Sequence, residues 1–191
     1  GTGGGLRAAV DDLADSVVIV NADILSDVNL TDLVASTPKG GAAMALRPSP
    51  DAEHIGPVEA NASGDVVRVT TVVPSSEGIP GTHFTGVHAM TREAVLRIPS
   101  DGEQCVVRTA YKTLVSERMV GHTLHQGTWV DVGKPDAYLD ANMAVLDGSV
   151  STPIDPWTRG HRGPRGSWVG SDVQLEGYVE RSIIGSGACV G

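Results

Sequence analysis

The chain has 191 residues, with 23 acidic and 14 basic side chains and a formal net charge of -9 at pH 7. This acidity argues against general binding of nucleic acids, because their phosphates attract basic surfaces. No apolar run approaches the roughly 18 residues of a membrane-spanning helix, and the first ten residues lack the pattern of a signal peptide. The two distant cysteines, Cys105 and Cys189, indicate reduced thiols. We therefore expect a cytoplasmic protein with no membrane or nucleic-acid partner.

The first part of the chain predicts helices alternating with strands. Helical spacing of apolar residues runs through 6–14. The β-branched run Val17–Val20 follows, and such a run is typical of a strand buried on both faces of a parallel sheet. Three further elements are predicted in the order helix, strand and hairpin: 30–36, 42–47, and 58–60 with 66–69 around the turn Asn61–Gly64.

The next part of the chain continues this alternation. A strand is predicted over 84–90, and Thr91 caps a short helix over 92–97. Apolar residues at helical spacing predict an amphipathic helix over 106–118. The remaining elements are a strand pair, 120–125 and 128–132 around Gln126-Gly127, and a helix over 136–147 that Pro135 begins.

The character of the chain changes after Gly148. Residues 149–167 are rich in Pro, Gly, Ser and Arg without any period, which predicts a linker. From Trp168 onward apolar residues recur at a spacing of six with one slip, at Val169, Leu175, Ile184 and Val190. This rhythm is typical of a hexapeptide β-helix, whose coils are stable only when several of them stack. Because the stub is short and the chain starts without Met, we expect a fragment of a longer protein.

Four motifs occur in a set order along the chain: GTGGGL at 1–6, VVIVNAD at 17–23, FTGVH at 84–88 and WVDVGKPDAYLDAN at 129–142. This order resembles the sugar-1-phosphate nucleotidylyltransferases, and most of all their mannose-1-phosphate guanylyltransferase-like branch. The resemblance implies an α/β fold in three parts. These are a Rossmann-like nucleotidyltransferase domain with a mixed sheet, incomplete at its N-terminus (1–148), a linker (149–167) and the start of a left-handed hexapeptide β-helix (168–191).

The resemblance also implies an activity and a metal site. Enzymes of this family form an NDP-sugar and pyrophosphate from an NTP and a sugar-1-phosphate, and the best match is mannose-1-phosphate guanylyltransferase. Asp23 and Asp131 match the two aspartates that bind the catalytic metal ion. Both follow apolar, strand-like segments, and open α/β sheets bind ligands at the carboxyl ends of their strands. Mg²⁺ prefers carboxylate ligands, so Mg²⁺ is the implied cofactor.

The glycines have a separate implied role. A base can lie close to the backbone only where no Cβ holds it away. Gly3, Gly4 and Gly5 match the turn that contacts the base, and Gly86 matches the glycine whose amide contacts the sugar. Read without the resemblance, these residues are ordinary turn and bulge glycines, Asp23 caps a turn, and Asp131 follows simple strand alternation.

The chain also departs from the family pattern. The glycine-rich phosphate-binding loop with its Arg and Lys is absent from these residues, so we expect the fragment alone to be inactive. The family often has Glu-Lys-Pro after the central hairpin, with its Lys on the sugar phosphate. Here Val69–Pro74 contains no lysine, and Arg68 is the candidate substitute. His122 and His125 lie three apart on a predicted strand and face opposite sides, which argues against a shared zinc ion.

Two other functions stay open at this point. The first is a non-catalytic homologue that binds a nucleotide sugar and regulates a partner. The second is a nucleotide-sugar-dependent glycosyltransferase, which the WVDVGKP segment and the hexapeptide tail disfavour. The base and the sugar are not specified by the sequence. Because hexapeptide tails often mediate assembly in the family, a homo-oligomer through the β-helix is a further expectation.

Overall fold

The computed structural model describes residues 1–70, 72–75, 78, 81–152 and 155–191. The chain divides into two compact units, Gly1–Gly127 and Thr128–Gly191, and each is described by itself. The predicted domain boundaries after 148 and 167 stay a prediction. None of the described helices is long and apolar enough to cross a membrane.

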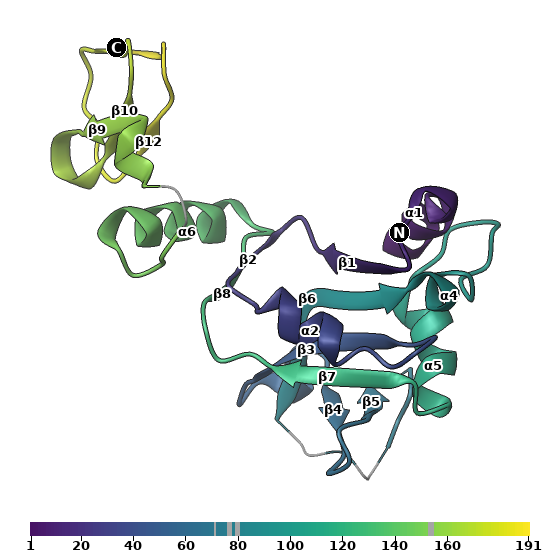
Figure 1. Cartoon of the computed structure of the whole chain (residues 1–191). Helices are drawn as coiled ribbons and strands as arrows, with labels where there is room; N and C mark the ends of the chain where they lie inside the picture. Colours follow the sequence, from purple (N-terminus) through teal and green to yellow (C-terminus); the bar gives the residue numbers. More distant parts are fainter. Residues whose placement is uncertain (71, 76–77, 79–80, 153–154) are drawn as a thin grey trace. The chain divides into compact units, whose positions relative to one another are not determined.

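A four-stranded sheet forms the centre of the first unit (Figure 1). The strands are β1 (Ser16–Val20), β6 (Thr82–Thr91), β3 (Ala42–Pro48) and β7 (Val120–Leu124), in that spatial order. Strand β6 is antiparallel to both β1 and β3, whereas β7 is parallel to β3. The predicted mixed sheet is therefore confirmed, and β1, β3 and β7 all run in the same direction.

Strand β1 differs from its predicted environment. The sequence predicts a strand of a parallel sheet buried on both faces, but β1 pairs antiparallel with β6. Its side chains alternate, because Val17 and Ile19 pack against the core while Val18 and Val20 are 36% and 48% exposed. The β-branched run thus reflects the preference of these residues for extended backbone rather than burial on two faces.

The predicted strand pair around Gln126-Gly127 is wrong. Strand β7 pairs in parallel with β3, with Ala42 opposite Val120. Two hydrogen bonds fix its end on the same neighbour, since His125 N donates to Leu46 O at 2.8 Å and Arg47 Nη1 donates to Gly127 O at 2.8 Å. A local turn signal cannot reveal such a partner, because a parallel neighbour is always distant in the sequence.

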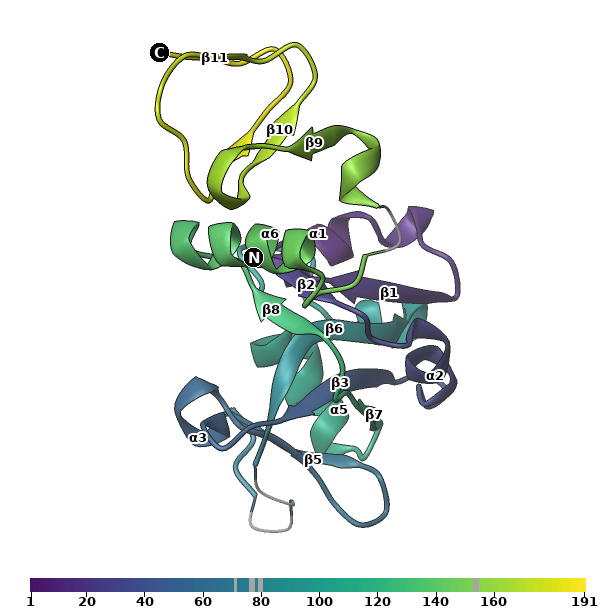
Figure 2. The ribbon, with the colours of Figure 1, turned by 90° about the vertical axis from the view of Figure 1, so that its left-hand side faces the viewer.

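Short helices and a hairpin surround the sheet (Figure 2). They are α1 (Thr2–Ala8), the 3-10 helix η1 (Val10–Asp12), α2 (Leu30–Ala35), α3 (Ala52–Ile55), α4 (Arg92–Val95), the π-helical η2 (Val107–Tyr111), α5 (Lys112–Ser116), and the hairpin of β4 (Val58–Ala60) and β5 (Val66–Val69). The predicted helix over 106–118 is therefore split into η2 and α5. The predicted cap is confirmed, because Thr91 Oγ1 accepts from Ala94 N at 3.1 Å.

Each face of the sheet has its own core. On one face, Leu33 of α2 packs with small side chains of β3 and β6. On the other, residues from β4, β5, α4, η2 and α5 form a larger cluster that includes the fully buried Tyr111. Burial on both faces holds β6 and β3 firmly between two layers. This arrangement fixes the strand ends at which candidate site residues lie.

The second unit begins with β8 (Trp129–Asp131) and α6 (Pro135–Asp147), which starts at proline and ends at the left-handed Gly148 as predicted. The helical turns η3 (Pro156–Thr158) and η4 (Pro164–Gly166) follow, together with the short strands β9 (Gly160–Arg162), β10 (Trp168–Gly170), β11 (Gln174–Leu175), β12 (Ile183–Ile184) and β13 (Cys189–Val190). Strands β10 and β12 pair in parallel, and so do β11 and β13. The left-handed hexapeptide β-helix stays a prediction.

Candidate functional site

The carboxyl ends of β1, β3 and β7 meet at one edge of the sheet, because these strands run in the same direction. A turn at residues 21–24 follows β1 and carries Asp23, whose side chain is exposed. Two backbone hydrogen bonds shape this turn: Ile24 N donates to Asn21 O at 3.2 Å, and Asn21 N donates to Gly86 O at 2.9 Å. The structure therefore brings the turn that carries Asp23 beside Gly86, as a shared site requires.

Gly86 lies at a bulge in β6 and has a φ angle of +81°. A Cβ on this residue would lie 2.9 Å from Asn21 Nδ2 and 3.0 Å from Ile24 Cγ1. Thr85 Oγ1 supports the bulge by donating to Ala45 O at 2.9 Å and accepting from Val87 N at 3.3 Å. The backbone geometry and the close Asn21 side chain both demand glycine here. Its contact with a sugar stays a prediction.

Gly3, Gly4 and Gly5 do not form the predicted turn, since all three lie inside α1. Gly3 is buried, and a Cβ there would lie 2.9 Å from both Gln104 O and Val106 N. Packing of α1 against the backbone of Gln104 and Val106 thus explains why residue 3 is glycine. A Cβ on Gly5, by contrast, would meet nothing within 4 Å. The proposed base contacts of the three glycines stay a prediction.

Asp131 lies in the second unit, at the end of β8, with an exposed side chain. Its Oδ1 accepts a hydrogen bond from Gly133 N at 2.9 Å, an Asx turn that leads toward α6. Asp23 belongs to the first unit, so a metal ion shared by the two carboxylates stays a prediction. Among the described residues no group of three His, Cys, Asp or Glu side chains forms a complete metal site.

A polar cluster at the same edge of the first unit was missed by the sequence analysis. His125 Nε2 lies 3.3 Å from Asp27 Oδ1, and the His125 side chain is 9% exposed. A Cβ on Gly127 would overlap the Asp27 carboxylate, and Arg47 binds the Gly127 carbonyl. Asp27 directly follows β2 (Ile24–Ser26) and His125 directly follows β7, so the signal available in the sequence was a polar side chain just after a strand. His122 binds elsewhere, with its Nδ1 2.9 Å from Gly64 O.

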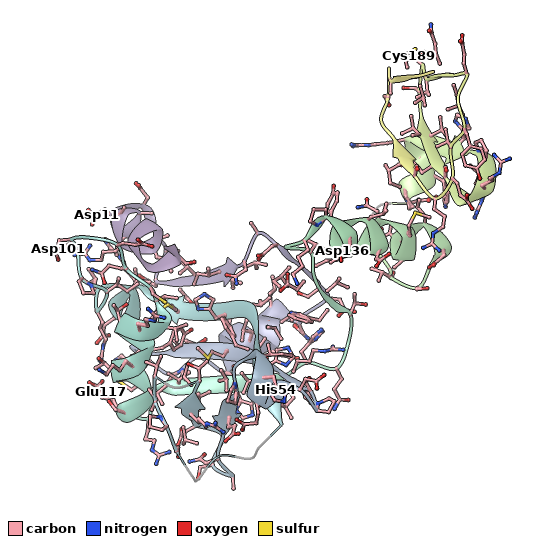
Figure 3. The ribbon with its side chains drawn as sticks, turned by 180° about the vertical axis from the view of Figure 1, so that it is seen from behind. Asp11, His54, Asp101, Glu117, Asp136 and Cys189 are labelled. Carbon is pink, nitrogen blue, oxygen red and sulfur yellow. The ribbon has the colours of Figure 1, made fainter. Side chains whose placement is uncertain are left out.

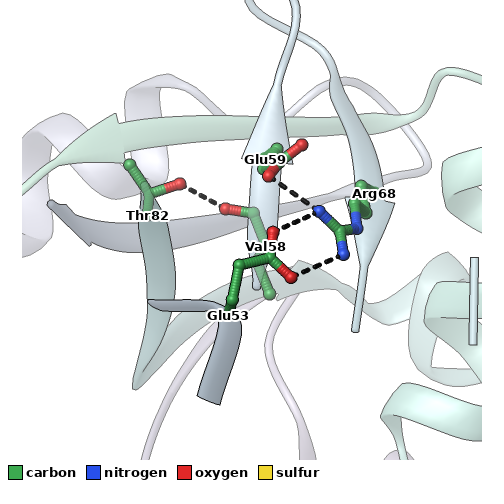
Figure 4. A network of polar contacts seen from close by, with 5 residues as sticks. All are labelled: Glu53, Val58, Glu59, Arg68 and Thr82. Atoms are coloured by element: carbon green, nitrogen blue, oxygen red, sulfur yellow. Dashed lines mark hydrogen bonds and ion pairs between the residues drawn. The ribbon is translucent and has the colours of Figure 1, made fainter. Parts of the chain in front are cut away.

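Arg68, the candidate substitute for the missing lysine, is held in an ion-pair network (Figure 4). Its two terminal nitrogens donate to the Glu53 carboxylate at 2.7 and 3.0 Å, and Nη1 also donates to Glu59 at 3.0 Å. The bond from Arg68 holds the pKa of Glu53 below its ordinary value. Two carboxylates therefore neutralise Arg68, and one of them, Glu59, is only 3% exposed. Arg68 thus stabilises the hairpin rather than binding a sugar phosphate.

Buried histidines lie along β6 as well. His83, 2% exposed, is opposite Arg47 in the register of β6 and β3. Burial, and then the charge of Arg47, lower its pKa. Further along, His88 Nδ1 lies 2.7 Å from the hydroxyl of Tyr111, and burial lowers the pKa of His88 to about 4. Both rings are therefore neutral at physiological pH, so neither adds positive charge near the edge.

Comparison with known proteins places the chain in a family. The model of the nucleotidyl transferase family matches residues 2–148. The crystal structure of HddC from Yersinia pseudotuberculosis is similar in fold, with a TM-score of 0.54 at 16% sequence identity over 74% of this chain and 60% of that chain. The complex of HddC with GMP-PN gives the same values. The chain thus spans about 60% of the length of these structures.

The comparison with curated proteins finds no match. The family match covers residues 2–127 of the first unit and extends through α6 of the second. It includes residues 2–6 of the first motif and all of the other three, and so confirms the resemblance at the level of the family. The chain belongs to the nucleotidyl transferase family.

Proposed function

We propose that the protein transfers a nucleotidyl group from an NTP to a sugar-1-phosphate and releases pyrophosphate. Mannose-1-phosphate and GTP are the first substrate pair to test, because the sequence motifs are nearest to that branch. The observation that carries the proposal is the position of the Asp23 turn against Gly86 at the carboxyl edge of the sheet, within a chain of this family. Open α/β sheets bind their ligands at this edge.

In the proposed reaction an oxygen of the sugar phosphate forms a bond to the α-phosphorus of the NTP. The bond from the α-phosphorus to the bridging oxygen breaks, and that oxygen leaves as part of pyrophosphate. Because three crowded phosphates carry this chemistry, catalysis consists mainly of positioning and charge neutralisation. The exposed side chain of Asp23 leaves its carboxylate available to a ligand at the edge.

The carboxylates of Asp23 and Asp131 would hold the Mg²⁺ ion. Both are exposed, and oxygen donors of this kind suit a hard cation. Mg²⁺ in phosphoryl-transfer enzymes usually takes only one or two carboxylates, with waters and substrate phosphates as its remaining ligands. Two aspartates are therefore a sufficient protein contribution. When bound, the ion neutralises charge on the phosphate oxygens.

The test is release of pyrophosphate by the full-length protein, supplied with Mg²⁺, an NTP and a sugar-1-phosphate in all combinations. We expect release only when all three are present. Asp23→Asn should lower turnover by about 100-fold or more, because a weaker metal ligand removes charge neutralisation at the phosphates. Asp12→Asn, at another exposed aspartate, is the matched control. Wild-type turnover by Asp23→Asn would contradict the assignment of the metal ligand.

A non-catalytic homologue that binds a nucleotide sugar is the second candidate. It is favoured by the neutralised Arg68 and by the absence of lysine from Val69–Pro74, which together leave the sugar phosphate without its usual cation. Calorimetry separates the two functions. Tight binding of a nucleotide sugar by a protein that releases no pyrophosphate under any substrate combination would establish the regulatory function and exclude the enzyme.

A further inference from the structure

A pocket of about 550 Å³ lies in the first unit, away from the Asp23 edge. Its walls come from segments at the opposite end of the strands. Arg97 follows α4, which begins where β6 ends, and Ser116 closes α5, which precedes β7. Since β6 runs antiparallel to β3 and β7 runs parallel to it, both segments lie at the amino edge of the sheet. The pocket thus shares no lining residue with the Asp23 edge.

Three basic side chains line this pocket: Arg97, Arg108 and Lys112. Arg97 is paired with Glu117, so its charge is already matched. Figure 3 shows Glu117 at the α5 end of the unit. Arg108 and Lys112 are exposed and lie one turn apart on η2 and α5, and no ion pair joins either to a described carboxylate. None of the described lining residues is acidic.

Two unmatched positive charges at one cavity are unusual in a protein whose net charge is -9. Like charges this close repel each other, and the repulsion is relieved when an anion binds between them. The same helical face adds the hydroxyl of Thr113 as a neutral donor. Phosphate oxygens accept charge-assisted hydrogen bonds from such groups, and an arginine can donate two of them in parallel.

The remaining wall of the pocket is apolar and firmly held. It is formed by Val72, Val73, Pro74 and Pro99. The Val73 backbone is tied to the hairpin, because Val69 N donates to Val73 O at 3.1 Å and Val73 N donates to Val69 O at 3.2 Å. The volume lies within the range of small-molecule sites. A ligand that fits both walls has a phosphate group at one end and a less polar body at the other.

We propose that this pocket binds the phosphate or diphosphate group of a small phosphorylated metabolite. Arg108 and Lys112 hold the anion, Thr113 donates to it, and the wall of residues 72–74 contacts the rest of the molecule. This site does not depend on the proposed transferase activity, because it shares no residue with the Asp23 edge. Its occupancy is therefore measurable in a protein that is catalytically silent.

The three lysines of the chain, Lys39, Lys112 and Lys134, allow a direct footprint. Each is acetylated at a limiting reagent concentration, and mass spectrometry of the 191-residue chain follows the rate at each position. The probe is inorganic pyrophosphate without divalent cations, at constant ionic strength. We expect acetylation of Lys112 to slow by about tenfold at ten times the dissociation constant. Lys39 is the surface control, and Lys134, near Asp131, reports on the candidate nucleotide site.

The variant Arg108→Gln tests the pocket itself. Loss of one charged donor should raise the pyrophosphate dissociation constant measured by protection of Lys112 by about tenfold or more, with Arg159→Gln as the control for removal of an exposed arginine elsewhere. Three results would overturn the proposal: no protection of Lys112, equal protection of Lys39 through general ionic effects, or full protection in Arg108→Gln. Protection of Lys134 alone would assign pyrophosphate to the candidate nucleotide site instead.

Discussion

At the scale of single residues, the ion pair of Arg68 with Glu59 shows how strongly the stability of a buried charge depends on its partner. Glu59 is 3% exposed and binds Arg68. Arg68→Met should lower the free energy of unfolding by about 3 kcal/mol, because it leaves a buried carboxylate without a cation. Glu53→Gln should cost much less, since Glu53 is 57% exposed. Urea unfolding followed by circular dichroism measures both. Equal losses of stability in Arg68→Met and Glu53→Gln would contradict this view. So would a double variant, Arg68→Met/Glu59→Gln, that is no more stable than Arg68→Met.

The buried His88 predicts a dependence of stability on pH. Burial lowers its pKa to about 4 in the folded protein, against an ordinary value of 6.5. Below 6.5 the unfolded chain gains a proton that the folded chain does not, so stability falls as the pH drops toward 4. The loss attributable to this group is about 3 kcal/mol. Urea midpoints between pH 7 and pH 4 measure the slope.

The control for this prediction is the exposed His161. His88→Leu should flatten the pH dependence of stability, although loss of the bond to Tyr111 lowers stability at pH 7 as well. His161→Leu should leave the slope as it is in the unsubstituted protein. An unchanged slope in His88→Leu would show that other groups produce the dependence.

At the scale of elements, the bulge in β6 positions the Asp23 turn. Gly86→Ala adds a Cβ that meets Asn21 and also strains a backbone with a φ of +81°. Gly64→Ala is matched, because its φ is +92° and its Cβ would meet nothing within 4 Å. We expect Gly64→Ala to cost about 1 kcal/mol and Gly86→Ala about 1–2 kcal/mol more. Urea unfolding measures the difference, and equal costs would show that Asn21 moves freely.

The helices and strands also show which features of the fold can be predicted from the sequence. The cap at Thr91, the turn Asn61–Gly64 and the start of α6 at Pro135 were predicted, because neighbouring residues alone decide them. The partner of β7 and the helical state of Gly3–Gly5 were not, because distant chain segments impose them. The same holds for the site. Motifs predict Asp23 and Gly86 as site residues, but no local pattern joins Asp27 to His125.

For the whole molecule, the division into two units gives each its own reporter. All three tryptophans, Trp129, Trp157 and Trp168, lie in the second unit. Val179→Ala removes two buried methyl groups there, since Val179 is 5% exposed, and should cost about 2 kcal/mol. The midpoint of unfolding by tryptophan fluorescence should fall accordingly. Val34→Ala, 39% exposed in the first unit, should leave that midpoint in place.

The bond between His88 and Tyr111 has a mechanical consequence. It joins two buried rings across the larger core at 2.7 Å, one on the strand of Gly86 and the other on the π-helical turn of Arg108. A displacement of that turn must either carry the strand with it or break the bond, and breaking a buried bond costs about 1–3 kcal/mol. The hydrogen bond therefore couples small movements of the π-helical turn to movements of β6.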